Sequence, residues 1–452
     1  MRKIKITRNP YLLFLPFLLL YVGFILVIQK NTLWGDEIRH FDQASNILKG
    51  FFSSSSDHIE IRNGPGYPLL LVPFLLLHLP LVFAKLLNAF FLYLSVVFLF
   101  KTLQRFTSFR IALLFGLFWG CYYNSLDFIS YLYSETFAAF LVSLVMLLLV
   151  KSFSPDGSTN SKRYVFLSGI CMGYLVLTKL IFGYVIMVLL IAVGLLWIIK
   201  RSAVNYKRSL AILLLAMATV APYLVYTYHE TGRVFYWGTS GGDNMYYMSS
   251  PYENEYGNWF SGTMLGADST SNSQNRDHEL AAKSLGDFIP GTLDSIKAHH
   301  LKNYQEVYKF KGAERDDAFK RIVYKNIKAH PVKFVKNCVS NIGRILFNFP
   351  YSYSAQKPGT LARLPLNGAI VLLTLFCLVP TFLNWRRISY PVRLILFISL
   401  IYFGGSIFGS AETRMFTVIV PFLLLWIAYI IQRTVKVKLK FDDSMNEEHP
   451  LI

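Results

Sequence analysis

The chain has 452 residues, of which 54% are hydrophobic and 16% charged, and its formal net charge is +19. In soluble domains about a quarter of the residues are charged, and several apolar runs here approach or exceed the roughly 18 residues that span a bilayer. The composition therefore excludes the soluble classes and predicts a multi-pass integral membrane protein.

The positive charge does not indicate a nucleic-acid partner. The Lys and Arg residues form short clusters between apolar runs, as they do in the cytoplasmic loops of membrane proteins. The four cysteines, Cys121, Cys171, Cys338 and Cys377, lie mostly in apolar segments and have no paired spacing. They predict neither a disulfide framework nor a zinc site.

The first predicted span lies within residues 1–30, where a basic start precedes a long apolar run without a small-residue cleavage site. We expect this span to be retained, because the run is too long for a signal-peptide core. The next stretch, "WGDEIRHFDQASNILKG", places Asp36, Glu37 and Arg39 within one helical turn where the chain leaves the lipid. Two adjacent carboxylates repel each other and are costly to desolvate, so we interpret them as part of a site.

Short basic loops predict the topology of the following spans. Placing all of these loops in the cytoplasm, together with the basic N-terminus, fixes the parity of the segments between them. The loops are residues 101–110, 151–163, 200–208, 386–393 and 433–440. Two spans are then expected within 111–150 and two within 165–199, with Lys179 at the outer turn of the second pair. The Pro-broken stretch "YPLLLVPFLLLHLP" should lie along or dip into the outer surface, before a span at 81–100.

The remaining segments complete an all-α integral membrane fold of about ten transmembrane helices with both termini cytoplasmic. The expected divisions are an N-terminal membrane half, 1–226, with the acidic-pair loop at 31–80; an extracytoplasmic region, 227–366; C-terminal spans, 367–432; and a cytoplasmic tail, 433–452. Within the extracytoplasmic region, residues 313–349 have helical periodicity that is interrupted near Pro331. The second half of this stretch suits a helix lying at the membrane interface.

Ionisable residues gather at the predicted outer face. Besides the acidic pair and Arg39 they are Asp42, Glu60, Arg62, Asp127, Glu135, Lys179, Arg233, Asp243, Glu412 and Arg414. For Asp127, Asp243 and Glu412 the first interpretation is a charged helix end at an interface. His40 is interpreted as an interfacial or packing residue, because no His/Asp cluster with the spacing of metal ligands is present in the sequence.

Seven stretches carry a resemblance to a known family. In chain order they are "WGDEIRHFDQASNILKG", "NGPGYPLLLVPFLL", "YSETFAAFL", "LVLTKLIFGY", "TGRVFYWGTSGGDNMYY", "AHPVKFV" and "ETRMFTVIVPFLLL". Together they resemble the polyprenyl-phosphate-sugar-dependent glycosyltransferases of the C-type superfamily (GT-C), within it the protein O-mannosyltransferase and lipid A aminoarabinose transferase group. The chain departs from that group in its short overall length and in having no soluble domain after the last span, which leaves the acceptor open.

The resemblance implies that a sugar moves from a polyprenyl-phosphate donor to an acceptor hydroxyl on a lipid, glycan or protein. Asp36 is expected to be the general base and Glu37 to orient it or bind the acceptor. Glu135 and Asp127 are the candidates for binding sugar or acceptor hydroxyls. The candidates for holding the donor phosphate are Arg39, Arg62, Lys179 and Arg414.

No metal and no cofactor other than the lipid-linked donor is expected, since cationic side chains can hold a single phosphate. A bacterial inner membrane with the site facing outside suits the size of the chain. The alternative is a transporter or flippase of lipid-linked sugars, which would be expected to show inverted repeats or charges along a path through the membrane.

Overall fold

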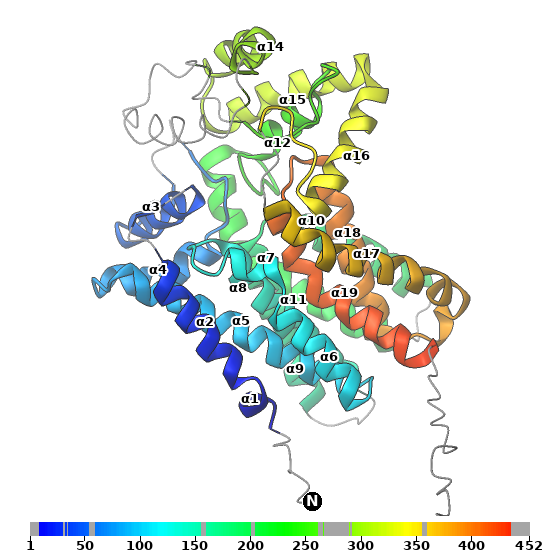
Figure 1. Cartoon of the computed structure of the whole chain (residues 1–452). Coiled ribbons are helices and arrows are strands. Elements are labelled where there is room, and N and C mark those ends of the chain that lie inside the picture. The colour runs from blue at the N-terminus through cyan, green and yellow to red at the C-terminus, as the bar shows by residue number, and fades with distance from the viewer. Residues whose placement is uncertain are drawn as a thin grey trace, which may run out of the picture.

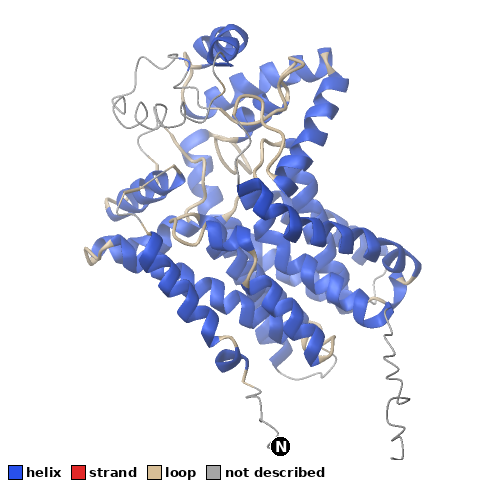
Figure 2. Cartoon of the chain, viewed as in Figure 1, coloured by secondary structure: helices blue, strands red, loops and turns tan. Residues whose placement is uncertain are grey.

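The structure is a computed structural model that describes residues 9–29, 32–33, 35–53, 59–154, 160–199, 204–260, 265, 289, 292–354 and 359–434. These residues are mostly helical, with loops between the helices (Figure 2). The predicted all-α class is therefore confirmed. The expected cytoplasmic tail from residue 435 onward and most of 261–291 lie outside the described residues.

Long apolar helices form a bundle, and shorter helices form a second layer at one end of it (Figure 1). Seven of the described helices are long and apolar enough to cross a membrane, so the chain is a multi-pass membrane protein. These helices are α5 (Leu81–Leu103), α8 (Ser134–Ser152), α10 (Ile181–Ile199), α11 (Val204–Thr231), α17 (Gly359–Leu383), α18 (Tyr390–Phe408) and α19 (Thr413–Thr434).

The other three expected spans also lie in the bundle. Helix α2 (Leu15–Ile28) follows the single turn α1 (Pro10–Leu13) and has 14 residues, whereas α6 (Phe109–Gly120) has 12. Helix α9 (Asn160–Thr178) packs along α8 and α11. The number of about ten spans stays a prediction.

Helices α8 and α19 are the most enclosed of the seven and pack against each other. In their apolar stretches 83% and 78% of the residues are buried, against 22–56% in the other five helices. Both helices begin within motifs quoted above, at Ser134 of "YSETFAAFL" and at Thr413 of "ETRMFTVIVPFLLL". Polar side chains in their first turns therefore lie within the protein rather than in lipid.

Two short helices follow the first span. Helix α3 (Asp36–Leu48) starts after Gly35, which has φ +57°, and a Cβ at Gly35 would lie 2.9 Å from the Tyr133 hydroxyl. Helix α4 (Gly66–Leu76) has 11 residues and is about 16 Å long, so it cannot cross a hydrocarbon layer of about 30 Å. This length agrees with the expectation that the Pro-broken segment does not span the membrane, which stays a prediction.

In the described part of the chain the second layer is formed by α12 (Gly241–Met248), α14 (Thr292–Val307), α15 (Gly312–Ala329) and α16 (Pro331–Phe347). This layer has its own aromatic core around Tyr246, Tyr304 and Phe319. The short helix α7 (Tyr123–Asp127) packs instead on α17 and α19 in the bundle. A short 3-10 turn, η3 (Trp385–Arg387), joins α17 to α18. The break predicted near Pro331 separates α15 from α16.

Helix α16 turns its polar side inward. Lys333, Asn337, Asn341 and Arg344 are buried, whereas Val332, Val335 and Val339 are exposed. The periodicity that predicted an interfacial helix is present, and the exposed side is the apolar one, as a helix facing lipid would have it. The buried polar side holds the loops of the second layer.

Asn341 connects α16 to the end of α18 and to the loop before α19. Its side-chain amide donates hydrogen bonds to the carbonyls of Ser406, Ile407 and Gly409, at 2.7–3.1 Å. Its side-chain oxygen accepts a hydrogen bond from the Ala411 N–H at 3.1 Å. The Asn341 side chain, together with a hydrogen bond from the Ser410 N–H to the Asn244 carbonyl, holds the loop that leads into the first turn of α19.

We predict that Asn341→Ala destabilises the protein, because it leaves a buried N–H and buried carbonyls without partners, at about 1–3 kcal/mol for each unsatisfied group. The measurement is the midpoint of thermal unfolding in detergent. Val339→Ala, on the exposed side of the same helix, is the control and should leave the midpoint nearly unchanged. Equal midpoints for Asn341→Ala and wild type would contradict this role of Asn341.

Candidate active site

Asp36, the first residue of α3, lies between two arginines. Its Oδ1 is 2.8 Å from Nη1 of Arg39, one helical turn later, and its Oδ2 is 2.6 Å from Nη1 of Arg414 on α19. Burial would raise the pKa of the Asp36 carboxyl, but Arg414 and Arg39 outweigh it and hold the pKa well below its usual range. The carboxylate is therefore ionised at neutral pH, and a quarter of the side chain remains exposed.

Arg414 extends the network from Asp36 to Glu135 and Lys179. Its Nη1 lies 3.7 Å from Oε1 of Glu135, and its Nε lies 3.1 Å from Oε2 of Glu412. Glu135 is in the first turn of α8 and accepts a hydrogen bond from Nζ of Lys179 at 2.7 Å. Lys179 lies between the end of α9 and the start of α10, at the turn predicted from the sequence.

We call the five residues Arg39, Asp36, Arg414, Glu135 and Lys179 the ion-pair network. They come from four separate parts of the chain, and the enclosed pair α8 and α19 supplies its centre. The Arg414 guanidinium also lies 5.3 Å from the ring centre of Tyr133, the second residue before Glu135. The sequence analysis missed Tyr133, although an aromatic residue beside a predicted acidic site is a suitable partner for a cation.

The side chain of Glu37 points away from that of Asp36 and into the protein. Its Oε1 accepts a hydrogen bond from the Leu132 N–H at 2.7 Å and lies 4.0 Å from Nζ of Lys85 on α5. The side chains of Glu37 and Lys85 are nearly inaccessible to solvent. Glu37 therefore anchors α3 to the segment before α8, and its expected role, to orient Asp36 or to bind the acceptor, stays a prediction.

Lys85 is a second residue that the sequence analysis missed. Its signal was a lysine in the first turn of an apolar span, where a charged side chain usually has a partner. With Glu37 it forms a buried acid–base pair beneath the ion-pair network.

His40 lies one turn after Asp36 and packs edge-on against Tyr67, with ring centres 5.0 Å apart. Burial lowers its pKa to about 4, and the neighbouring Arg39 and Lys179 contribute in the same direction against Asp36 and Glu135. The imidazole is therefore neutral at pH 7. The expected packing role of His40 agrees with this position.

Two of the predicted site residues belong to other ion pairs. Arg62 pairs with Asp243 on α12. Asp127 pairs with Arg363 on α17, whose Nη2 lies 2.5 Å from its carboxylate. In the described part of the chain neither Arg62 nor Asp127 makes a hydrogen bond or an ion pair with the ion-pair network. The structure therefore does not bring them together with the other residues expected to bind phosphate or sugar.

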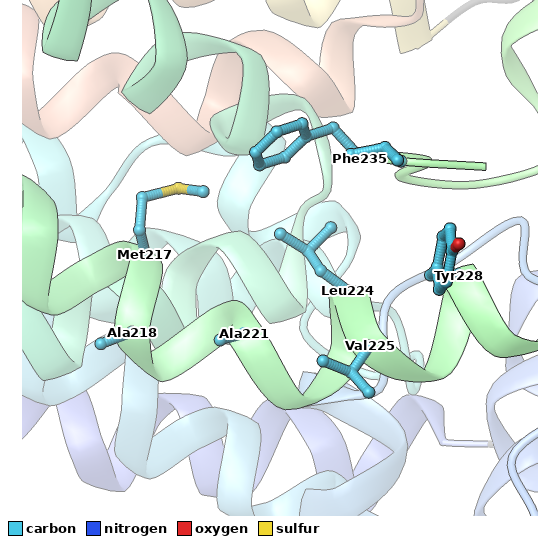
Figure 3. A pocket seen from close by; sticks show the side chains of 8 residues that line it. Met217, Ala218, Ala221, Leu224, Val225, Tyr228 and Phe235 are labelled. Carbon is cyan, nitrogen blue, oxygen red and sulfur yellow. The ribbon is translucent and has the colours of Figure 1, made fainter.

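An apolar groove of about 560 Å³ runs along one side of α11, where Phe235 faces the helix (Figure 3). Its lining residues are Met217, Ala218, Ala221, Leu224, Val225, Tyr228, Val234 and Phe235. None of them belongs to the ion-pair network.

No family model and no curated protein matches the chain. Among solved structures, it is similar to the Saccharomyces cerevisiae protein O-mannosyltransferase Pmt1-Pmt2 complex bound to the sugar donor, with 16% identity, 50% of this chain and 34% of that chain covered, and a TM-score of 0.39. It is also similar to ArnT from Cupriavidus metallidurans bound to undecaprenyl phosphate, with 12% identity, coverage of 93% and 77%, and a TM-score of 0.42.

A third similar structure is the archaeal oligosaccharyltransferase AglB from Archaeoglobus fulgidus in complex with an inhibitory peptide and a dolichol-phosphate. The identity is 11%, the coverage is 95% of this chain and 52% of that chain, and the TM-score is 0.46. The chain thus spans about a third of the length of the O-mannosyltransferase chain and about half of that of AglB. An O-mannosyltransferase is one of the two kinds of protein that the sequence motifs resemble.

Proposed function

We propose that the chain is a membrane glycosyltransferase of the GT-C type that moves a hexose or pentose from a polyprenyl-phosphate donor to an acceptor hydroxyl. The observation that carries this proposal is the ion-pair network at the outer-face end of the enclosed helices α8 and α19. It combines a partly exposed carboxylate, which can take a proton, with three cations, which can hold a phosphate. The seven motifs, in family order, support the same function.

In this mechanism Asp36 is the general base. The acceptor hydroxyl gives its proton to the Asp36 carboxylate while its oxygen attacks the anomeric carbon of the donor. The bond from that carbon to the phosphate oxygen breaks, and the polyprenyl phosphate leaves with the bonding electron pair. Attack from the face opposite the phosphate inverts the configuration at the anomeric carbon.

Arg414, Arg39 and Lys179 stabilise the charge that develops on the leaving phosphate. Arg414 is the central cation because it lies within ion-pair distance of three carboxylates, those of Asp36, Glu135 and Glu412. Glu135 is placed to accept hydrogen bonds from sugar hydroxyls once Lys179 and Arg414 turn toward the phosphate.

The network also links donor binding to the strength of the base. A carboxylate held by two arginines is a weak base, because its pKa lies far below the operating pH. A donor phosphate offers Arg39 and Arg414 a second anion, so the two arginines shift from Asp36 toward the phosphate. Asp36 then loses cationic neighbours and its pKa rises. The donor therefore binds first and activates Asp36 for the acceptor.

The proposal places the reaction outside a bacterial inner membrane, with both termini in the cytoplasm. A polyprenyl tail stays in lipid while its phosphate reaches the interface, where the ion-pair network begins. The partners are the lipid-linked sugar, the bilayer and a hydroxyl-bearing lipid, glycan or protein.

Asp36→Asn should lower the rate of sugar transfer by about 10²–10⁴, since it removes the base and keeps the shape of the side chain. The measurement is transfer of labelled sugar from a panel of polyprenyl-phosphate sugars by the purified protein. The control is Glu60→Gln, which removes a more exposed carboxylate that also contacts Arg39, with Nε and Oε1 3.3 Å apart. A rate for Asp36→Asn within about threefold of wild type would exclude Asp36 as the base.

The two arginines should differ in effect. Arg414→Ala should reduce the single-turnover rate by about 10²–10³, the usual cost of removing a group that stabilises developing negative charge. Arg39→Ala should cost less, because in the described part of the chain Arg39 forms ion pairs only with Asp36 and with the exposed Glu60. A larger loss for Arg39→Ala would identify Arg39 as the main phosphate ligand instead.

The pH dependence should separate the free enzyme from the donor complex. The acidic limb of kcat/KM reports the low pKa of Asp36 in the free enzyme, and the acidic limb of kcat reports its pKa in the complex. Because the donor draws the arginines away from Asp36, kcat should begin to fall at a higher pH than kcat/KM as the pH is lowered. Acidic limbs at the same pH would contradict the proposed coupling between donor binding and base strength.

A further inference from the structure

A second cluster of ionisable side chains lies in the second layer and shares no residue with the ion-pair network. Glu255, in the loop 249–260, meets His299 and His300 on α14. Oε1 of Glu255 is 2.8 Å from Nδ1 of His299, and Oε2 is 2.9 Å from Nε2 of His300. One ligand atom from each of the three residues can be chosen so that all lie within 4.8 Å of one another.

These three groups form a ligand set that zinc prefers. Two imidazole nitrogens and one carboxylate oxygen bind Zn²⁺ at about 2.0–2.2 Å, which in a tetrahedral site sets neighbouring ligand atoms about 3.3 Å apart. The atoms of Glu255 and His299 would therefore move apart by about half an ångström.

Neighbouring side chains hold both rings in a suitable orientation. Nδ1 of His300 is 2.7 Å from the Tyr246 hydroxyl, which also accepts a hydrogen bond from the Asn303 amide. If Nδ1 carries the proton and donates to Tyr246, the lone pair of Nε2 faces Glu255, which is the arrangement that metal-binding histidines commonly have. His299 is stacked on Tyr252, with ring centres 3.6 Å apart and an angle of 5° between the rings.

A fourth oxygen lies beside the cluster. The Tyr353 hydroxyl is buried and neighbours the Glu255 carboxylate. It is placed to support a bound water, which would be the fourth ligand of a tetrahedral ion.

We propose that Glu255, His299 and His300 bind a Zn²⁺ ion that fastens the loop 249–260 to α14. The opposite side of this loop is already held by α16. Nζ of Lys333 donates to the carbonyls of Glu253 and Glu255, and the Asn337 amide donates to those of Met248 and Ser250. The ion completes the attachment of the loop, so its role is structural and does not depend on the proposed transfer reaction.

The test uses the full chain, purified in detergent and stripped of metal with a chelator. Titration with Zn²⁺ in a calorimeter should show one site per chain with a Kd below about 1 µM. The midpoint of thermal unfolding should rise with Zn²⁺ and should not rise with Mg²⁺, because Mg²⁺ prefers octahedral oxygen ligands. Absence of a one-to-one Zn²⁺ site in the folded wild-type protein would overturn the proposal.

Variants locate the site. Glu255→Gln keeps the shape of the side chain but replaces one acceptor oxygen by an amide donor, and His299→Ala changes a ring that is a third exposed. Each should weaken Zn²⁺ binding at least 100-fold, since loss of a supporting partner alone costs 10–100-fold. The control is His229→Ala, a histidine whose side chain is 85% exposed. Gel filtration checks that each variant is folded, and unchanged Zn²⁺ affinity in both cluster variants would show that the ion binds elsewhere.

Discussion

The ion pair between Asp36 and Arg414 is the contact on which the candidate site depends. It joins the first residue of α3 to the first turn of α19, across 378 positions of sequence. A carboxylate next to an apolar bundle has a high desolvation cost, which a nearby cation offsets. Arg414 supplies that cation and at the same time approaches Glu135 on α8. Arg414 thus contributes both to the position of α3 against the bundle and, together with Arg39, to the charge state of its first residue.

The surrounding fold keeps that guanidinium in place. Helices α8 and α19 are enclosed by other helices, so the charged residues in their first turns face protein rather than lipid. The loop before α19 is fixed by Asn341 of α16, which binds the end of α18 and the Ala411 N–H. Helix α16 also holds the loop 249–260 through Lys333 and Asn337. The second layer thus supports the site through the buried polar side of α16.

The sequence predicted those features that local patterns determine. The apolar runs indicated the helical membrane class, the Pro-rich stretch indicated a helix too short to span, and Lys179 was expected at the turn where it lies. The predicted topology also placed Asp36, Arg39 and Arg414 at the same face of the membrane, as parts of one site. That much follows from hydropathy and from the sidedness of basic loops.

The sequence could not predict which partner each charge would find. Asp36 and Glu37 are neighbours in sequence, yet helical geometry turns one toward the arginines and the other toward Leu132 and Lys85. Arg62 and Asp127 face partners on α12 and α17 because pairing depends on packing between distant helices. The cluster of Glu255 with His299 and His300 was missed for the same reason, since 44 residues separate Glu255 from the first histidine.

The central claim is that Asp36 and the donor phosphate compete for the same arginines. The most direct measurement is the affinity of a polyprenyl phosphate without sugar for wild-type protein and for Asp36→Asn. Because the neutral amide releases Arg39 and Arg414, the account predicts that Asp36→Asn binds the lipid phosphate severalfold more tightly, although it transfers sugar poorly. Weaker or unchanged binding of the lipid phosphate by Asp36→Asn would contradict the account.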